Sequence, residues 1–264
     1  MIIYKNKLPN PTPLSNPATS DITPEQNDAM PLLAKIPDLK FDIDRLQWCM
    51  KNIVLKVPPY WAGGATDKRP QRKYGGWSLT SSNGDVHDGW QSVSGWANGK
   101  FNIDLAYKNG YIPRWFHTKR TPICIDYFAE VMDTLEEMGF YPHAVRIWIN
   151  PAGGHHVGPH TDNADNRYSA RLHIPLITNE GCVHEWYADP EDYKVHIPAD
   201  GSAYMFRTNI LHDVYNHGTE DRYHIIAEVY DTKHVVEGYG YDHIEKLDAM
   251  FKREVKYFLG REIP

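Results

Sequence analysis

The chain has 264 residues, 41% of them hydrophobic, which is enough to bury a sizeable core, most simply within one large domain. Its net charge is −6 and its basic residues form no cluster, which argues against non-specific nucleic-acid binding. Cys49, Cys124 and Cys182 are widely spaced without a Cys-x-x-Cys pair, so we expect reduced thiols rather than a disulfide framework. The N-terminus has no apolar leader and no run reaches membrane-spanning length. We therefore expect a cytoplasmic protein that binds neither nucleic acid nor membrane, of unknown oligomeric state.

The first 38 residues are rich in proline and lack sustained periodicity, which predicts an N-terminal arm on the surface. Residues 39–264 are expected to form a single domain. Near its start, Asp42 and Asp44 precede an amphipathic run. This pattern predicts a short helix whose apolar positions are Leu46, Cys49, Met50 and Ile53.

Between residues 60 and 116, glycines alternate with aromatic residues. Aromatic loops beside a catalytic core often line a substrate pocket, so Trp77 is a candidate substrate contact. The alternative, that these aromatic side chains pack the outer sheet, is equally open.

A second helix is predicted to begin at Thr121-Pro122, because a capping residue followed by proline is typical of a helix start. Apolar residues follow at helical spacing as far as Met138, and Gly139 would end the helix. We expect its apolar stripe to pack against a sheet.

From about residue 143 to 232, short strand-like runs alternate with Gly, Pro and Asn turns, and no helix fits between them. This pattern predicts a mainly β protein with flanking helices, built as an antiparallel jelly roll rather than as a parallel α/β sheet. A last apolar stripe at helical spacing, at about residues 242–259, predicts a C-terminal helix that closes the domain.

A candidate metal site lies within the strand-rich part. Two histidines and one aspartate are the ligands of a mononuclear Fe(II) site that leaves three positions open, and His160, Asp162 and His212 supply these residue types. On an extended segment residues i and i+2 point to the same face, so His160 and Asp162 can reach one metal. His212 completes the site only if the fold brings two strands together. Because the chain has 14 His, one His-x-Asp is expected by chance.

Arg222 lies ten residues after His212 and could clamp a dicarboxylate co-substrate. Together with the three candidate ligands, this cation predicts an oxygenase. The motifs around it form an ordered series: Arg146, Asn150-Pro151, His160, Arg171-Leu172-His173, Cys182, Trp186, His212-Asp213-Val214-Tyr215-Asn216 and Arg222.

This series resembles the aspartyl/asparaginyl β-hydroxylase family of Fe(II)/2-oxoglutarate dioxygenases, within the double-stranded β-helix (jelly roll, cupin-like) superfamily. The His-x-Val-x-Asn run, followed six residues later by Arg, is its most specific part. The resemblance implies that His160 and His212 bind iron and that Arg222 pairs with the distal carboxylate of 2-oxoglutarate. It places Arg171 and His173 near the inner end of the co-substrate or the substrate carboxylate.

One departure from the family bears on the substrate. The best-known animal members lack the carboxylate ligand, whereas this chain has Asp162. That moves it toward bacterial free-amino-acid hydroxylases of the same superfamily. A complete ligand set also favours hydroxylation over halogenation, because halogenases replace the carboxylate to make room for chloride.

We therefore predict an enzyme that uses Fe(II), 2-oxoglutarate and O2 to hydroxylate an unactivated C–H bond of an amino acid or an amino-acid-like small molecule. Further candidates for contacts near the substrate, besides Trp77 and Arg171, are Arg146, His155, Arg207 and Asn209. Three alternatives remain open: the same chemistry on a peptide or protein residue, a cupin-type metalloenzyme that is not an oxygenase, and a non-catalytic binding module.

Overall fold

A computed structural model describes nine segments of the chain: residues 32–62, 74–88, 96–97, 100–101, 117–138, 140–161, 170–187, 192–208 and 210–231. The predicted C-terminal helix at 242–259 and most of the predicted arm lie outside these segments. So do two of the candidate site residues, Asp162 and Asn209.

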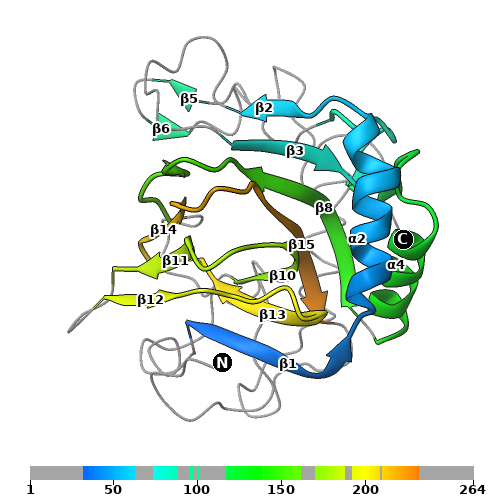
Figure 1. Ribbon diagram of the computed structural model, residues 1–264. Coiled ribbons are helices and arrows are strands. Elements are labelled where there is room, and N and C mark those ends of the chain that lie inside the picture. The colour runs from blue at the N-terminus through cyan, green and yellow to red at the C-terminus, as the bar shows by residue number, and fades with distance from the viewer. Residues whose placement is uncertain are drawn as a thin grey trace, which may run out of the picture.

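Two antiparallel sheets form the body of the described protein (Figure 1). In spatial order, the larger sheet consists of β1 (Leu33–Lys40), β13 (Ser202–Arg207), β10 (Ala170–Ile177), β15 (Arg222–Asp231), β8 (Phe140–Asn150), β3 (Tyr74–Ser78) and β2 (Tyr60–Ala62). The smaller sheet consists of β12 (Tyr193–Val195), β11 (Cys182–Trp186), β14 (His212–Asn216) and β9 (His155–His156). Two further pairs are β4 (Thr80–Ser81) with β7 (Lys119–Arg120), and β5 (Trp96–Ala97) with β6 (Lys100–Phe101).

From β8 onward the chain crosses repeatedly between the two main sheets. Strands β8, β10, β13 and β15 lie in the larger sheet, and β9, β11, β12 and β14 in the smaller one. A chain that winds back and forth in this way forms a double-stranded β-helix, and every strand pair in it is antiparallel. The predicted jelly roll is confirmed, and its strands run from Phe140 at the start of β8 to Asp231 at the end of β15.

Alternation along the larger sheet separates an apolar face from a polar one, because successive strand residues point to opposite sides. The apolar face joins helices α2 (Ile43–Asn52) and α4 (Tyr127–Glu137) in the main hydrophobic core, and the two helices run along one side of the sheet in Figure 1. The sheet residues of this core include Val145, Ile147 and Ile149 of β8, Leu172, Ile174 and Leu176 of β10, and Ile225 and Ala227 of β15.

The first helix lies where the sequence predicts it, whereas the second begins later than predicted. At the start of α2, the side chain of Asp42 accepts a hydrogen bond from the backbone N–H of Arg45 at 3.1 Å. Helix α4 begins at Tyr127, after Asp126 with φ +50°, and not at Thr121-Pro122. The reason is tertiary: the Thr121 hydroxyl donates to the carbonyl of Ser78 at 2.7 Å, which ties this segment to β3.

Part of the predicted N-terminal arm belongs to the sheet. Strand β1 begins at Leu33, and its residue Ala34 pairs with Met205 of β13. Leu32 and Leu33 are buried in a second hydrophobic cluster with Trp186. The predicted boundary at residue 38 is therefore corrected, because these apolar side chains cover the edge of β13 and the space between the two sheets.

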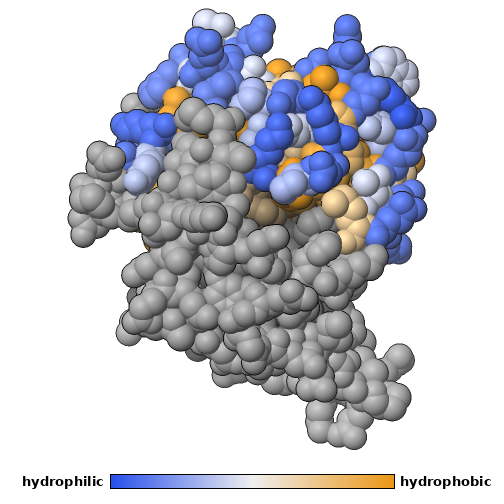
Figure 2. Space-filling view, turned by 90° about the horizontal axis from the view of Figure 1, so that it is seen from below, coloured by the Kyte–Doolittle hydropathy of each residue, from blue (hydrophilic) through white to orange (hydrophobic). Residues whose placement is uncertain are grey.

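None of the described helices is long and apolar enough to cross a membrane. Figure 2 views the molecule from below the orientation of Figure 1. On the described part of that face, hydrophobic residues show as small areas between hydrophilic ones, as on an ordinary solvent-exposed surface.

Candidate active site

A cavity of about 210 Å³ lies between the two sheets, on the polar face of the larger one. Its walls come from alternate positions of β8, β10, β13, β14 and β15, together with neighbouring residues. The lining residues are Tyr74, Arg146, Trp148, Val157, His160, Arg171, His173, Phe206, Thr208, His212, Val214, Arg222 and Ile226.

The fold brings His160 and His212 together across some fifty residues of sequence. The two form an antiparallel bridge in which each backbone N–H donates to the carbonyl of the other at 2.9 Å. Their ring centroids are 4.4 Å apart. The condition that the sequence left open, two strands meeting at these histidines, is therefore met.

The second nitrogen of each ring orients it for metal binding. His160 Nδ1 lies 2.7 Å from the carbonyl of Gly158, and His212 Nδ1 lies 2.8 Å from that of Ile210. A carbonyl oxygen only accepts, so each Nδ1 carries the proton and each Nε2 carries the lone pair. That is the form in which a histidine held by a backbone carbonyl ligates a metal. The donor pair fits a divalent iron, and Asp162, the candidate third ligand, lies outside the described residues.

Arg222 also lines the cavity, at the start of β15, and is only 2% exposed. Its Nη2 donates to Nε2 of His184 at 2.7 Å and to Nδ1 of His224 at 2.8 Å. Its Nε has no hydrogen-bond partner, and no carboxylate of the described residues pairs with the guanidinium. Burial lowers the pKa of Arg222 to about 10, which still leaves the side chain charged at neutral pH. A buried cation without a counter-ion is costly, so this site attracts an anion.

Three buried histidines surround this guanidinium. His173, His184 and His224 each have a pKa well below the ordinary value of 6.5, first because burial disfavours their charged form and then because Arg222 repels a second cation. They are neutral at pH 7. The sequence did not single out His184 or His224, whereas the structure places both against Arg222. One signal could have indicated His224: it follows Arg222 by two residues on a strand and therefore shares its face.

These three histidines also lie close enough to suggest a metal site, because one ring nitrogen of each lies within 4.8 Å of the others. However, His184 and His224 both accept a hydrogen bond from Arg222. A divalent cation there would lie beside a buried guanidinium, where like charges repel strongly. The pair formed by His160 and His212 is the better metal site.

Two more arginines make the cavity wall cationic. Arg146 is buried, donates from Nη1 to the carbonyl of Ala144 at 3.1 Å and lies 5.2 Å from the ring centroid of Trp148. Arg171 forms an ion pair with Glu228, 3.3 Å between Nη2 and Oε1. Both side chains line the cavity, as expected for groups that bind carboxylates.

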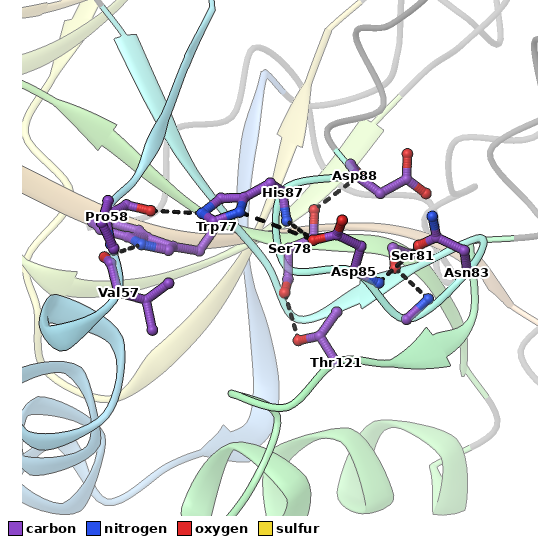
Figure 3. A network of polar contacts seen from close by, with 11 residues as sticks. Val57, Pro58, Trp77, Ser78, Ser81, Asn83, Asp85, His87, Asp88 and Thr121 are labelled. Carbon is purple, nitrogen blue, oxygen red and sulfur yellow. Dashed lines mark hydrogen bonds and ion pairs between the residues drawn. The ribbon is translucent and has the colours of Figure 1, made fainter.

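Trp77 does not line the cavity, which corrects the expectation of a substrate contact. Its indole Nε1 donates to the carbonyl of Val57 at 2.7 Å, as Figure 3 shows, and its ring lies 6.3 Å from that of Tyr223 in the main core. On β3 the alternation places Tyr74 on the cavity side, where its ring lies 5.2 Å from Trp148. The sequence showed the aromatic content of this segment but not which face each side chain takes.

Arg207 and His155 also lie away from the described cavity lining. Arg207 follows Phe206 on β13, and because Phe206 faces the cavity its neighbour points to the other side. His155 belongs to β9, where its neighbour His156 donates from Nδ1 to Asp213 at 3.1 Å. Cavity residues that the sequence did not single out include Tyr74, Trp148, Phe206 and Thr208. One signal could have indicated Trp148: it follows Arg146 by two residues on a strand, so the two side chains share a face.

Comparisons with known proteins add to this geometry. A protein-family model described as Aspartyl/Asparaginyl beta-hydroxylase matches residues 78–232. No curated protein matches the sequence. Among solved structures, an oxidoreductase of the 2OG-Fe(II) oxygenase family from Burkholderia pseudomallei is 12% identical, with a TM-score of 0.42, covering 78% of this chain and 88% of that one.

Two further structures are prolyl hydroxylases. One, from Trichoplax adhaerens, is in complex with a peptide fragment of the hypoxia inducible factor oxygen degradation domain; it is 14% identical with a TM-score of 0.44, covering 77% of this chain and 85% of that one. The other, a prolyl-4-hydroxylase from Pseudomonas putida, is 13% identical with a TM-score of 0.39, covering 75% of this chain and 92% of that one.

Proposed function

This chain belongs to the aspartyl/asparaginyl β-hydroxylase family, and from that premise we propose that it hydroxylates an unactivated C–H bond of an amino acid or an amino-acid-like small molecule. It is a 2-oxoglutarate-dependent dioxygenase whose reaction requires Fe(II), 2-oxoglutarate and O2. Because this family consists of oxygenases, two of the alternatives are discarded: the non-catalytic binding module and the metalloenzyme that is not an oxygenase.

The observation that carries the proposal is the pairing of two features in one cavity. His160 and His212 present their Nε2 lone pairs, and Arg222 presents a buried cation without a carboxylate partner among the described residues. A dicarboxylate that chelates a metal at one end needs a cation for its other end. The cavity offers both.

The residues divide the work as follows. We propose that His160, Asp162 and His212 hold the iron, and that the carbonyls of Gly158 and Ile210 keep the two rings turned toward it. Iron held there would supply the activation of O2 that couples oxidative decarboxylation of 2-oxoglutarate to hydroxylation of the substrate. Arg222 binds the distal carboxylate of the co-substrate and so sets its distance from the metal.

Other residues of the cavity wall are proposed to bind the substrate and to exclude water. Arg146 and Arg171 are the proposed contacts for a substrate carboxylate, because both line the cavity with planar donor groups. His173 stacks on Phe206 with 4.9 Å between ring centroids, and this buried pair helps to exclude water from the inner end of the co-substrate. Any role for Asn209 remains a prediction, because that residue lies outside the described segments.

The test is an anaerobic titration of the metal-free protein with Fe(II) and then 2-oxoglutarate, followed by the visible charge-transfer band of the chelate. We expect the band in the wild-type protein and no band in His160→Ala. In Arg222→Ala the Kd for 2-oxoglutarate should rise about 30-fold or more, since losing one partner of a buried charge pair costs about 2 kcal/mol or more.

Arg120→Ala is the matched control for Arg222→Ala. Arg120 is an arginine on the protein surface, paired with Asp133 at 2.6 Å, and its removal should leave the band unchanged. If the wild-type protein forms no band at any concentration of 2-oxoglutarate, the proposed site is wrong.

A further inference from the structure

We propose that His184 and His224 are positioning residues that hold the guanidinium of Arg222 without neutralising it, so that its charge is reserved for the distal carboxylate of the co-substrate. We call these two residues the histidine seat. The identity of the anion rests on the proposed function; the lack of a carboxylate partner for Arg222 among the described residues does not.

The histidine seat is assembled from both sheets. His184 lies on β11 of the smaller sheet, whereas His224 lies on β15 of the larger one, yet both reach the same atom, Nη2 of Arg222. An Nη group has two hydrogens, and the two rings accept them at 2.7 and 2.8 Å. Both side-chain hydrogen bonds that Arg222 makes with described residues start from Nη2. The histidine seat therefore holds one end of the guanidinium and leaves its other donors for a ligand.

Neutral rings are the significant feature of this arrangement. Buried arginines are ordinarily paired with carboxylates, and a carboxylate in place of either ring would compete with the co-substrate for the same cation. Burial and the guanidinium itself hold the pKa of His184 and of His224 well below 6.5, so both rings accept hydrogen bonds without adding charge.

His173 completes the uncharged surroundings of the seat. Its ring stands edge-on to both seat residues, 5.9 Å between centroids in each case, and it too is buried with a lowered pKa. Glu228, on the same strand as Arg222 and His224, pairs with Arg171 rather than with Arg222. Within the described part of the chain, the cation thus has polar acceptors around it and no anion paired with it.

The test uses two pairs of near-isosteric variants that differ in charge. His184 accepts through Nε2, a position that a glutamine amide oxygen can reach, so His184→Gln is compared with His184→Glu. His224 accepts through Nδ1, closer to its backbone, so His224→Asn is compared with His224→Asp. The affinity of the anaerobic Fe(II)-loaded protein for 2-oxoglutarate is measured by calorimetry for all four.

The amide variants should bind 2-oxoglutarate within about fivefold of the wild-type Kd, because they keep a neutral acceptor. Each carboxylate variant should bind about 100-fold more weakly than its amide counterpart, because Arg222 then has an internal counter-ion. At saturating 2-oxoglutarate, kcat should change little while the KM for 2-oxoglutarate follows the Kd.

A second readout separates positioning from a merely structural role. In the metal-free protein without co-substrate, each carboxylate variant should have the same Tm as its amide counterpart or a higher one, because the new charge compensates a buried cation. A structural defect would lower affinity and Tm together. If the histidine seat acts as proposed, a carboxylate variant has a lower affinity for 2-oxoglutarate than its amide counterpart but an equal or higher Tm.

Two results would overturn the inference: equal affinities within each pair, or a carboxylate variant that unfolds at a lower temperature than its amide counterpart. If the wild-type protein does not bind 2-oxoglutarate, the proposed function fails instead. The comparison of Tm values, which needs no ligand, then still decides whether Arg222 lacks a counter-ion.

Discussion

Histidine has two distinct roles in this cavity, and the partner of one ring nitrogen decides between them. In His160 and His212 the protonated Nδ1 donates a hydrogen bond to a backbone carbonyl, which leaves Nε2 as a metal donor. In His184 and His224 an arginine donates to the ring, which makes the histidine an acceptor beside a cation. The same residue type thus serves the metal at one place and the co-substrate clamp at another.

The buried histidines also make stability depend on pH. The pKa of His173, His184 and His224 is lowered in the folded protein relative to the ordinary 6.5 of the unfolded chain. Below pH 6.5 the unfolded chain binds more protons, so the stabilisation that is present above that pH is lost as the pH falls. Each histidine adds a slope of up to about 1.4 kcal/mol per pH unit to the free energy of unfolding.

Urea unfolding at a series of pH values between 5 and 7.5 measures this slope. We expect His184→Gln to show a slope smaller than that of the wild-type protein by up to about 1.4 kcal/mol per pH unit. Asn52→Ala, a surface change that removes no titratable group, is the control and should keep the wild-type slope. An unchanged slope in His184→Gln would mean that His184 is not buried in its neutral form.

At the scale of elements, two asparagines join the larger sheet to the smaller one. Asn216, at the end of β14, donates from Nδ2 to the carbonyls of Asn150 and Glu220 at 2.9 and 2.8 Å. Asn150, at the end of β8, donates to the carbonyl of Val214 at 3.2 Å. Both side chains are fully buried. The asparagine of the His-x-Val-x-Asn run therefore holds β14, and with it His212, against the strand that carries Arg146.

Loss of the hydrogen bonds that Asn216 makes between the sheets should lower the free energy of unfolding. Asn216→Ala removes a donor from the buried carbonyl of Asn150, so we expect the free energy of unfolding to fall by about 1–3 kcal/mol. Asn52→Ala removes a comparable bond, to the carbonyl of Trp48 at 2.9 Å, but on the surface, and should change stability by no more than about 0.5 kcal/mol. Chemical denaturation compares the two variants, and equal effects would contradict a structural joint at Asn216.

At the scale of the whole molecule, one cavity between the sheets has to take both the co-substrate and the reacting part of the substrate. Its described volume of about 210 Å³ is below the range of typical drug-sized pockets, which suits two small molecules better than one large ligand. The three arginines on its wall favour anionic groups.

We therefore expect free amino acids to stimulate succinate formation more than peptides that contain the same residue in blocked form. Arg146→Ala should raise the KM for the amino acid about tenfold or more while the Kd for 2-oxoglutarate changes little, because a charge-assisted hydrogen bond contributes about 1.5–3 kcal/mol. A screen of succinate release, with each substrate in free and blocked form, measures both effects. Stronger stimulation by the blocked peptides would redirect the proposal to a peptide or protein residue.

Local patterns in the sequence were enough for several features. The run after Asp42 predicts α2 because capping and helical periodicity are properties of neighbouring residues. Short strands with turn residues predict the jelly roll from 143 to 232 for the same reason. Spacing and residue type also singled out His160, His212, Arg171, His173 and Arg222, all of which line the cavity.

Only the tertiary structure decided which segments far apart in the chain contact one another. The start of α4 moved to Tyr127 because Thr121 bonds to Ser78, and Trp77 turned into the core because β3 pairs with β8 in one register. His184 and Arg222 are 38 residues apart and lie in different sheets, so no local pattern links them. Chain-local propensity acts over a few residues, whereas burial and the pairing of charges are fixed only when the two sheets close over the same cavity.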